Sequence, residues 1–163
     1  MAYHRTLITL AAVTQLFSVA CGGGGDEDPN KNDPLSNEEI VRCDMPEDHA
    51  CREYQRGQQG NATAFVDLPA ARSSCAGGWP GGSPAPGVFS ADSCNSEGAL
   101  GRCVTQTHTL PRLNTVDYFY PEFGDTATAE DPLEPLRKLC AAVQQDAAAH
   151  DVDVTSTFEI PPF

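Results

Sequence analysis

The sequence has few basic residues and no long uninterrupted apolar run. Its 163 residues include 10 Lys and Arg against 23 Asp and Glu, which gives a net charge of −13 at pH 7. Binding to nucleic acid requires a basic surface. A membrane-spanning helix requires about 20 predominantly apolar residues, whereas residues 7–19 form a shorter segment that contains Thr14 and Gln15. We therefore expect no nucleic-acid partner and no transmembrane helix.

Sequence motifs for catalysis and cofactor binding are also missing. The chain contains no Gly-x-Ser-x-Gly, no phosphate-binding loop, no dinucleotide fingerprint and no Cys-x-x-Cys pair. His49, His108 and His150 are far apart, and no neighbouring residue marks a catalytic site. We expect a protein without enzyme activity and without a cofactor. A small secreted hydrolase is an alternative, because catalytic residues converge in space rather than in sequence.

Two short patterns offer potential metal ligands. Cys43, His49 and Cys51 are close enough in sequence for a zinc site, and residues 151–155 place oxygen atoms at alternating positions. Disulfides explain the cysteines better in an exported protein. The segment 151–155 lacks the glycine and the distal glutamate of an EF-hand loop. We expect no metal site.

The N-terminus has the three parts of a secretory signal peptide. His4 and Arg5 form a short basic region, residues 7–19 form the apolar region, and the small residues Ser18 and Ala20 precede a cleavage site. Residues 1–20 are therefore predicted to be a signal peptide, and the protein is predicted to be exported.

Seven cysteines are an odd number for an oxidising compartment. They are Cys21, Cys43, Cys51, Cys75, Cys94, Cys103 and Cys140. Attachment of lipid to Cys21 would leave an even set of six for three disulfides. The alternative is ordinary secretion, with Cys21 as a structural thiol after a plain cleavage site.

The segment ending at Cys21 resembles the lipobox of bacterial lipoproteins. Ala20 and Cys21 match that motif well, Val19 is acceptable, and Ser18 replaces the usual aliphatic residue. The resemblance implies a thiol that carries lipid and a protein attached to the cell envelope. Gly22 after the lipidated cysteine implies sorting to the outer membrane.

The mature chain divides into a tether and one domain. Residues 21–42 are predicted to be a flexible acidic tether, because 22–35 are rich in Gly, Asp, Asn and Pro. The capping-box spacing of residues 36–39 predicts one helical turn before Cys43. Residues 43–163 are predicted to form a single disulfide-stabilised domain, which gains stability from covalent links because its apolar content is modest.

Hydrophobic periodicity and capping residues predict an α+β fold. A short strand at 51–54 and an extension at 63–66 precede a helix capped by Asp67. A second, clearly amphipathic helix follows Asp131. Further strands are predicted at 100–107, 116–120 and 152–160. The order strand-helix-strand-strand-helix-strand is that of ferredoxin-like folds.

A loose internal repeat suggests how the cysteines pair. In each half a strand cysteine precedes a helix cysteine, first Cys51 and Cys75, then Cys103 and Cys140. If the halves are pseudo-repeats, those pairs form and Cys43 pairs with Cys94. Six cysteines allow fifteen pairings, so the other pairings stay open.

The loop at residues 77–87 carries Trp79, which is the only tryptophan. One interpretation places Trp79 over the edge of the core. The other makes it an exposed contact residue of a binding surface, because aromatic residues in loops often mark such surfaces.

The cysteine series resembles a family of small six-cysteine modules in lipoproteins of myxobacteria and their relatives. The shared features are a Cys-x-x-Tyr strand at 51–54, a Gly-x-Cys strand at 101–103, a tyrosine-rich strand at 118–120 and a helix near Cys140. The resemblance covers residues 43–140. It implies a fold and a location but no activity.

The combined expectation is a lipid-anchored, non-enzymatic structural or binding module of the bacterial cell envelope. Its partners would be the membrane, through the lipid, and an unidentified envelope or extracellular protein. The main alternative is a protein that inhibits a protease or binds a ligand through the loop at 77–87.

Overall fold

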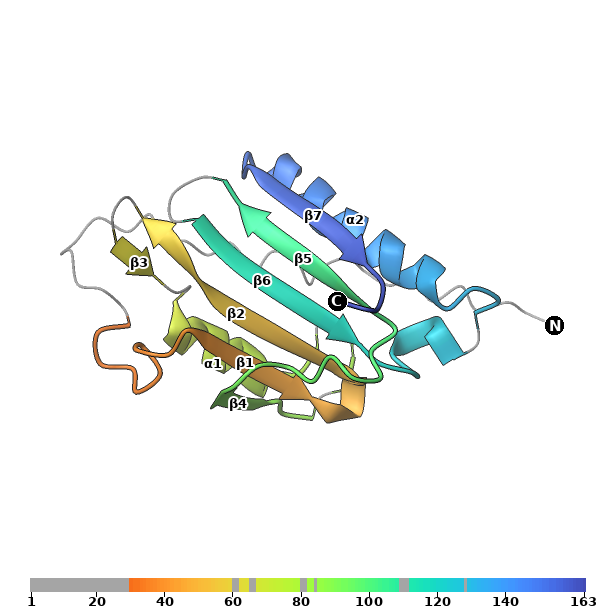
Figure 1. Ribbon diagram of the computed structural model, residues 1–163, viewed down its shortest axis with the longest axis horizontal. Coiled ribbons are helices and arrows are strands. Elements are labelled where there is room, and N and C mark those ends of the chain that lie inside the picture. The colour runs from red at the N-terminus through yellow and green to blue at the C-terminus, as the bar shows by residue number, and fades with distance from the viewer. Residues whose placement is uncertain are drawn as a thin grey trace.

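The computed structural model describes residues 30–59, 62–64, 67–79, 82–83, 85–108, 112–127 and 129–163. One antiparallel sheet with two helices on one side forms the domain (Figure 1). The strands are β1 (Ile40–Met45), β2 (Ala50–Gln59), β3 (Ala62–Ala64), β4 (Val88–Ala91), β5 (Gly101–Thr107), β6 (Arg112–Phe119) and β7 (Val154–Glu159). The helices are α1 (Leu68–Ala76) and α2 (Leu133–Ala149), with short 3₁₀ turns η2 (Pro46–Asp48) and η3 (Gly124–Ala127).

The sheet has seven strands. Six of them follow the order β4-β1-β2-β6-β5-β7, and the short β3 pairs with β2 beside this path. Every pair is antiparallel. Residues directly opposite each other in register point to the same side of a sheet. One such row crosses the whole sheet and consists of Phe89, Cys43, Arg52, Asp117, Cys103 and Phe158. Both helices cover this side, because each is bonded to it through a cysteine of the row.

The mixed α+β class is confirmed, but the predicted element order and the ferredoxin-like arrangement are not. Two strands, β1 and β4, were not predicted, and together they form one edge of the sheet. The helical turn predicted at residues 36–39 is absent, since these residues form a turn and a bend before β1. The folded part also begins before the predicted boundary at residue 43, because Val41 in β1 is completely buried.

Local sequence explains both helices. The Asp67 carboxylate accepts a hydrogen bond from the Ala70 N–H at 2.9 Å and so caps the start of α1, as predicted. The Asp131 carboxylate accepts one from the Leu133 N–H at 2.9 Å at the start of α2. The predicted apolar stripe of α2 is buried at Leu136, Cys140, Val143 and Ala147. Among the described residues, no helix combines the length and hydrophobicity that crossing a bilayer requires.

Candidate binding surfaces

Three disulfides join all six cysteines of the predicted domain. The pairs are Cys43–Cys75, Cys51–Cys94 and Cys103–Cys140. The pairing suggested by the internal repeat is right for Cys103–Cys140 and wrong for the other two pairs. Cys43 lies opposite Arg52 in register, so these two side chains point to the same side of the sheet. Cys51 is the neighbour of Arg52 in β2, and neighbouring residues of a strand point to opposite sides, so Cys43 and Cys51 lie on different sides. Cys43 can therefore reach α1, and Cys51 cannot.

The loop after α1 is held by one carboxylate. Asp48, at the end of η2, accepts hydrogen bonds from the Trp79 N–H at 2.8 Å and from the Ser83 N–H at 2.5 Å. A side chain at Gly82 would clash with this carboxylate, because an added Cβ would lie 2.2 Å from its oxygen. The described part of the glycine-rich loop is thus packed around Asp48. The sequence pattern did not identify this role of Asp48.

Trp79 is half-buried and packs onto the side of the sheet that carries the helices. Its ring meets Phe119 edge-on at 5.7 Å and Phe123 at 5.2 Å between ring centres. The Arg52 guanidinium lies 5.1 Å from the centre of the Trp79 ring. The side chain therefore covers the edge of the core, which is the first of the two positions considered from the sequence.

A buried ion pair lies under Trp79. Arg52 donates two hydrogen bonds to the Asp117 carboxylate, at 2.5 and 3.0 Å, and both residues are more than nine-tenths buried. Burial alone would lower the pKa of the Arg52 guanidinium, but the Asp117 charge raises that pKa above its usual value. Burial also raises the pKa of the Tyr54 phenol beside it. Arg52, Asp117 and Tyr54 interact with one another, so their polar groups stabilise the core.

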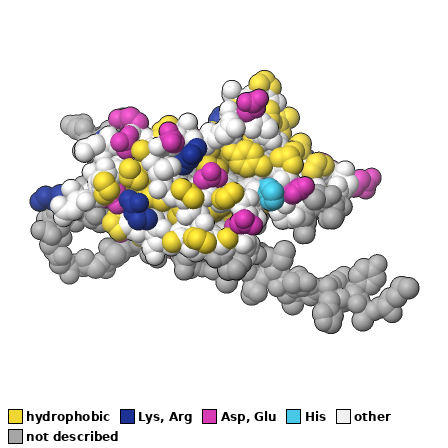
Figure 2. All heavy atoms as spheres, turned by 90° about the horizontal axis from the view of Figure 1, so that it is seen from below, with side chains coloured by type: hydrophobic (Ala, Val, Ile, Leu, Met, Phe, Trp, Pro, Cys, Tyr) yellow, Lys and Arg dark blue, Asp and Glu magenta, His cyan; other side chains and the backbone are white. Residues whose placement is uncertain are grey.

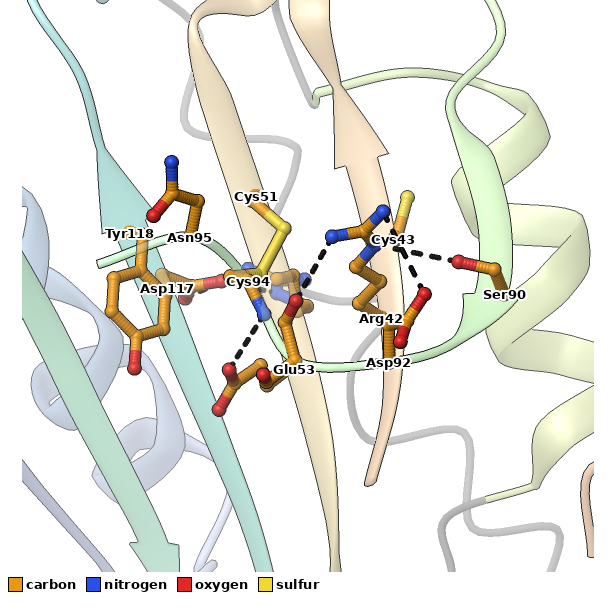
Figure 3. The surroundings of a disulfide bond; sticks show 12 residues. Arg42, Cys43, Cys51, Glu53, Ser90, Asp92, Cys94, Asn95, Asp117 and Tyr118 are labelled. Carbon is orange, nitrogen blue, oxygen red and sulfur yellow. Dashed lines mark hydrogen bonds and ion pairs between the residues drawn. A yellow bond between two sulfur atoms is a disulfide. The ribbon is translucent and has the colours of Figure 1, made fainter. Parts of the chain in front are cut away.

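The other side of the sheet is covered by an irregular segment, residues 92–100. The Cys51–Cys94 disulfide fastens it, and the buried Glu53 carboxylate accepts a hydrogen bond from the Cys94 N–H at 2.8 Å (Figure 3). Arg42 donates to the Ser93 carbonyl at 2.9 Å. Tyr120 donates to the Asn95 carbonyl at 2.5 Å. Side chains of the sheet therefore bind the backbone of a segment that has no regular hydrogen bonding of its own.

His49 and His108 lie at opposite ends of the sheet and do not share a site. His49 lies beside the Phe119 end of β6, where its carbonyl accepts from the Tyr120 N–H. His108 follows β5 at the opposite end of the sheet and lies 2.9 Å from the Thr155 hydroxyl. Within the described part of the chain, no group of three His, Cys, Asp or Glu residues is arranged to hold a metal ion.

A groove of about 500 Å³ runs between α2 and β7. Its lining residues are Arg137, Cys140, Ala141, Gln144, Gln145, Ala148, Ser156 and Phe158. The Gln144 side chain crosses the groove and accepts a hydrogen bond from the Ser156 N–H at 3.2 Å. Sequence reasoning did not identify this surface, because it depends on the position of β7 at the sheet edge.

The last residues of the predicted tether contact α1. The Asn30 side chain accepts a hydrogen bond from the Leu68 N–H at 2.7 Å, and the Asp33 carboxylate binds Arg72 at 3.0 Å. Leu35 packs against the buried pair Val41 and Leu68. The chain thus enters the domain at the helix layer. Cys21, the predicted lipidation site, lies outside the described residues.

The described surface is mixed in character. Figure 2 shows the side that lies at the bottom of Figure 1, where acidic side chains are scattered and Lys and Arg appear in a few separate places. Hydrophobic side chains lie between them. The exposed large hydrophobic residues of the described chain are Val88, Ile160 and Phe163.

Comparisons with protein-family models, with curated proteins and with solved structures give no match for this chain.

Proposed function

We propose that the protein is a lipid-anchored, non-enzymatic binding module of the bacterial cell envelope. The observation that carries this proposal is the cysteine pairing. Three disulfides use six of the seven cysteines. Cys21 remains. It follows a signal-like segment, and Ala20 and Cys21 match the lipobox well. A thiol that carries lipid accounts for the odd cysteine.

The partners of three carboxylates, of which only Asp117 and Glu53 are buried, support a binding role rather than a catalytic one. Asp117 is bound by Arg52, Glu53 by the Cys94 backbone and Asp48 by the loop backbone. Each group stabilises a neighbouring segment. The protein would act by presenting a rigid surface at the membrane, with an envelope or extracellular protein as its partner.

The intact mass of the protein extracted from membranes tests this proposal. We expect a chain that starts at Cys21, carries acyl groups and exposes six alkylatable thiols only after reduction. A chain without acyl groups, or with free thiols before reduction, would overturn it.

The contacts of Asp48 with Trp79 and Ser83 favour a second candidate, in which the described part of the loop at 77–87 is the binding element. A loop held in one shape loses little entropy on binding a partner. Retention of a captured envelope protein by the Ser83→Tyr variant, with its added bulk, would contradict this candidate. Loss of that protein, with unchanged thermal stability, would support it.

A further inference from the structure

The two edges of the sheet differ in their protection against strand pairing. Edge strands are commonly shielded by shortness, by proline or by charge. The edge strand β4 has four residues and follows Pro86 and Gly87. The edge strand β7 has six residues, Val-Thr-Ser-Thr-Phe-Glu, with neither proline nor lysine and with a charge only at Glu159. The two strands lie at opposite edges in Figure 1. Of these two strands, β7 is the one with the features of an open edge.

The outer edge of β7 lies along the groove beside α2. Of the lining residues, Arg137 alone is charged, and it is paired with Asp131 at 3.2 Å. The rest of the lining is small, amide or aromatic, in a chain of which 20% is charged. Depletion of charge is typical of the centre of a protein–protein interface. We define the β7 edge surface as β7 together with Ala141, Gln144, Gln145 and Ala148.

The backbone of β7 offers hydrogen bonds toward this groove. The Ser156 N–H points away from β5, because it reaches Gln144 on α2. In an antiparallel strand alternate residues direct their N–H groups to the same side. The N–H groups of Val154 and Phe158 therefore point outward as well. The Gln144 side chain accepts the hydrogen bond from the Ser156 N–H that a carbonyl of a neighbouring strand would otherwise accept.

We propose that the β7 edge surface binds a second copy of this chain, with the two β7 strands antiparallel across a two-fold axis. Two copies that each carry a charge of −13 repel one another. They can associate only where the contact itself is nearly free of charge, and the β7 edge surface meets this condition. The pairing is closed, because it uses the β7 edge of both copies, and the β4 strand at the other end of each sheet is short.

The symmetry also suits attachment to one membrane, a step that rests on the proposed lipidation of Cys21. A two-fold axis between antiparallel strands of a continuous sheet is perpendicular to that sheet, so both helix layers lie on the same side. Asn30 and Asp33 contact α1 in this layer. Residues 22–29 span at most about 30 Å. Both anchors can therefore reach one bilayer.

Sedimentation equilibrium over a range of concentrations tests the dimer. The protein used is residues 21–163 with Cys21→Ser, which carries no lipid. The measurement therefore tests dimer formation independently of lipidation. We expect the average mass to rise toward twice that of one chain. A mass that stays monomeric up to about 1 mM, a typical effective concentration for tethered partners, would overturn the proposal.

Two neighbouring alanines near the end of α2 give a matched pair of variants. Both are exposed, but Ala148 lines the groove and Ala149 does not. Ala148→Glu places a charge in the contact and should weaken association at least about tenfold, whereas Ala149→Glu should leave it unchanged. Equal effects of the two variants would place the contact elsewhere and contradict the proposal.

Amide hydrogen exchange provides a second readout in the same protein. The Phe158 amide should exchange more slowly as the concentration rises, and the Ala148→Glu variant should lose this dependence. A dimer in which Phe158 exchange is independent of concentration does not use β7, and the proposal would then be wrong.

Discussion

The two sides of the sheet are covered by different means. On one side, two helices satisfy their own backbone hydrogen bonds and bury apolar side chains such as Leu68 and Leu136. On the other side, the irregular segment 92–100 depends on Cys51–Cys94 and on side chains of the sheet, notably Glu53 and Arg42.

The comparison shows where polar residues are required. A helix needs only an apolar stripe and a cap, whereas an irregular segment leaves backbone groups that must find partners. On the side covered by helices, the polar side chains of Arg52 and Asp117 are buried in the centre. They bind each other, whereas Glu53 and Arg42 on the other side bind the backbone of the covering segment.

Removing one partner of the buried ion pair should be the most damaging change. Asp117→Ala leaves the Arg52 charge buried without compensation and should reduce the free energy of unfolding by about 3–5 kcal/mol. The double variant Arg52→Met/Asp117→Leu should lose clearly less. Urea unfolding with the disulfides intact measures both. The exposed pair of Lys138 with Glu134 is the control, since Lys138→Ala should cost less than about 1 kcal/mol. A double variant that is less stable than Asp117→Ala would contradict this account of the pair.

Removing the disulfide of the irregular side should cost slightly less but act locally. Cys51→Ala/Cys94→Ala should lower stability by about 2–4 kcal/mol, and amides of residues 92–100 should lose protection from hydrogen exchange. The matched variant Cys103→Ala/Cys140→Ala should leave α2 protected, because its helix and buried stripe persist. Equal loss of protection in both segments would refute the distinction between the two coverings.

Removing the carboxylate that holds the loop should have a smaller effect. Asp48→Ala deprives the N–H groups of Trp79 and Ser83 of their acceptor and should cost about 1–3 kcal/mol. Because Trp79 is the only tryptophan, its fluorescence reports on the loop directly and should shift to longer wavelength. An unchanged spectrum would show that Asp48 does not position Trp79.

The smallest expected effect is a loss of stability in alkali. Burial, followed by the nearby Asp44 charge, raises the pKa of Tyr120 to about 12, compared with about 10 in an unfolded chain. The folded state thus favours the neutral phenol, so its contribution is complete below pH 10 and is lost as the pH rises toward 12. Tyr120→Phe should flatten part of this decline in unfolding titrations. The loss of stability in alkali that persists in this variant should come from Tyr54, because burial raises the pKa of that phenol as well.

The sequence was sufficient for elements whose signals are local. The capping residue Asp67 predicted α1 correctly, and the amphipathic pattern after Asp131 did the same for α2. The strand β1 was missed because charged residues interrupt Ile40–Met45, and β4 because it has four residues. Such strands owe their conformation to their neighbours in the sheet.

The candidate surfaces could not be predicted to the same extent, because they depend on pairing between distant segments. The contact between Arg52 and Asp117 follows from the register of β2 with β6. The groove beside α2 follows from the edge position of β7. The choice of disulfide partner for Cys43 and for Cys51 depends on which side of the sheet each cysteine faces. The alternation of residues within one strand does not determine which side a cysteine faces unless the register with the neighbouring strand is known.

Disulfide mapping tests the assignment of the two sides most directly. Cleavage of the unreduced protein at arginine and aspartate separates all six cysteines, because each of the five intervals between them contains a cleavage site: Asp44, Arg72, Asp92, Arg102 and Arg112. The structure predicts linked peptides for Cys43–Cys75, Cys51–Cys94 and Cys103–Cys140. Peptides that link Cys51 to Cys75 and Cys43 to Cys94 would contradict it, since the helix α1 would then lie on the Cys51 side of the sheet, opposite α2, and the segment 92–100 would lie on the Cys43 side.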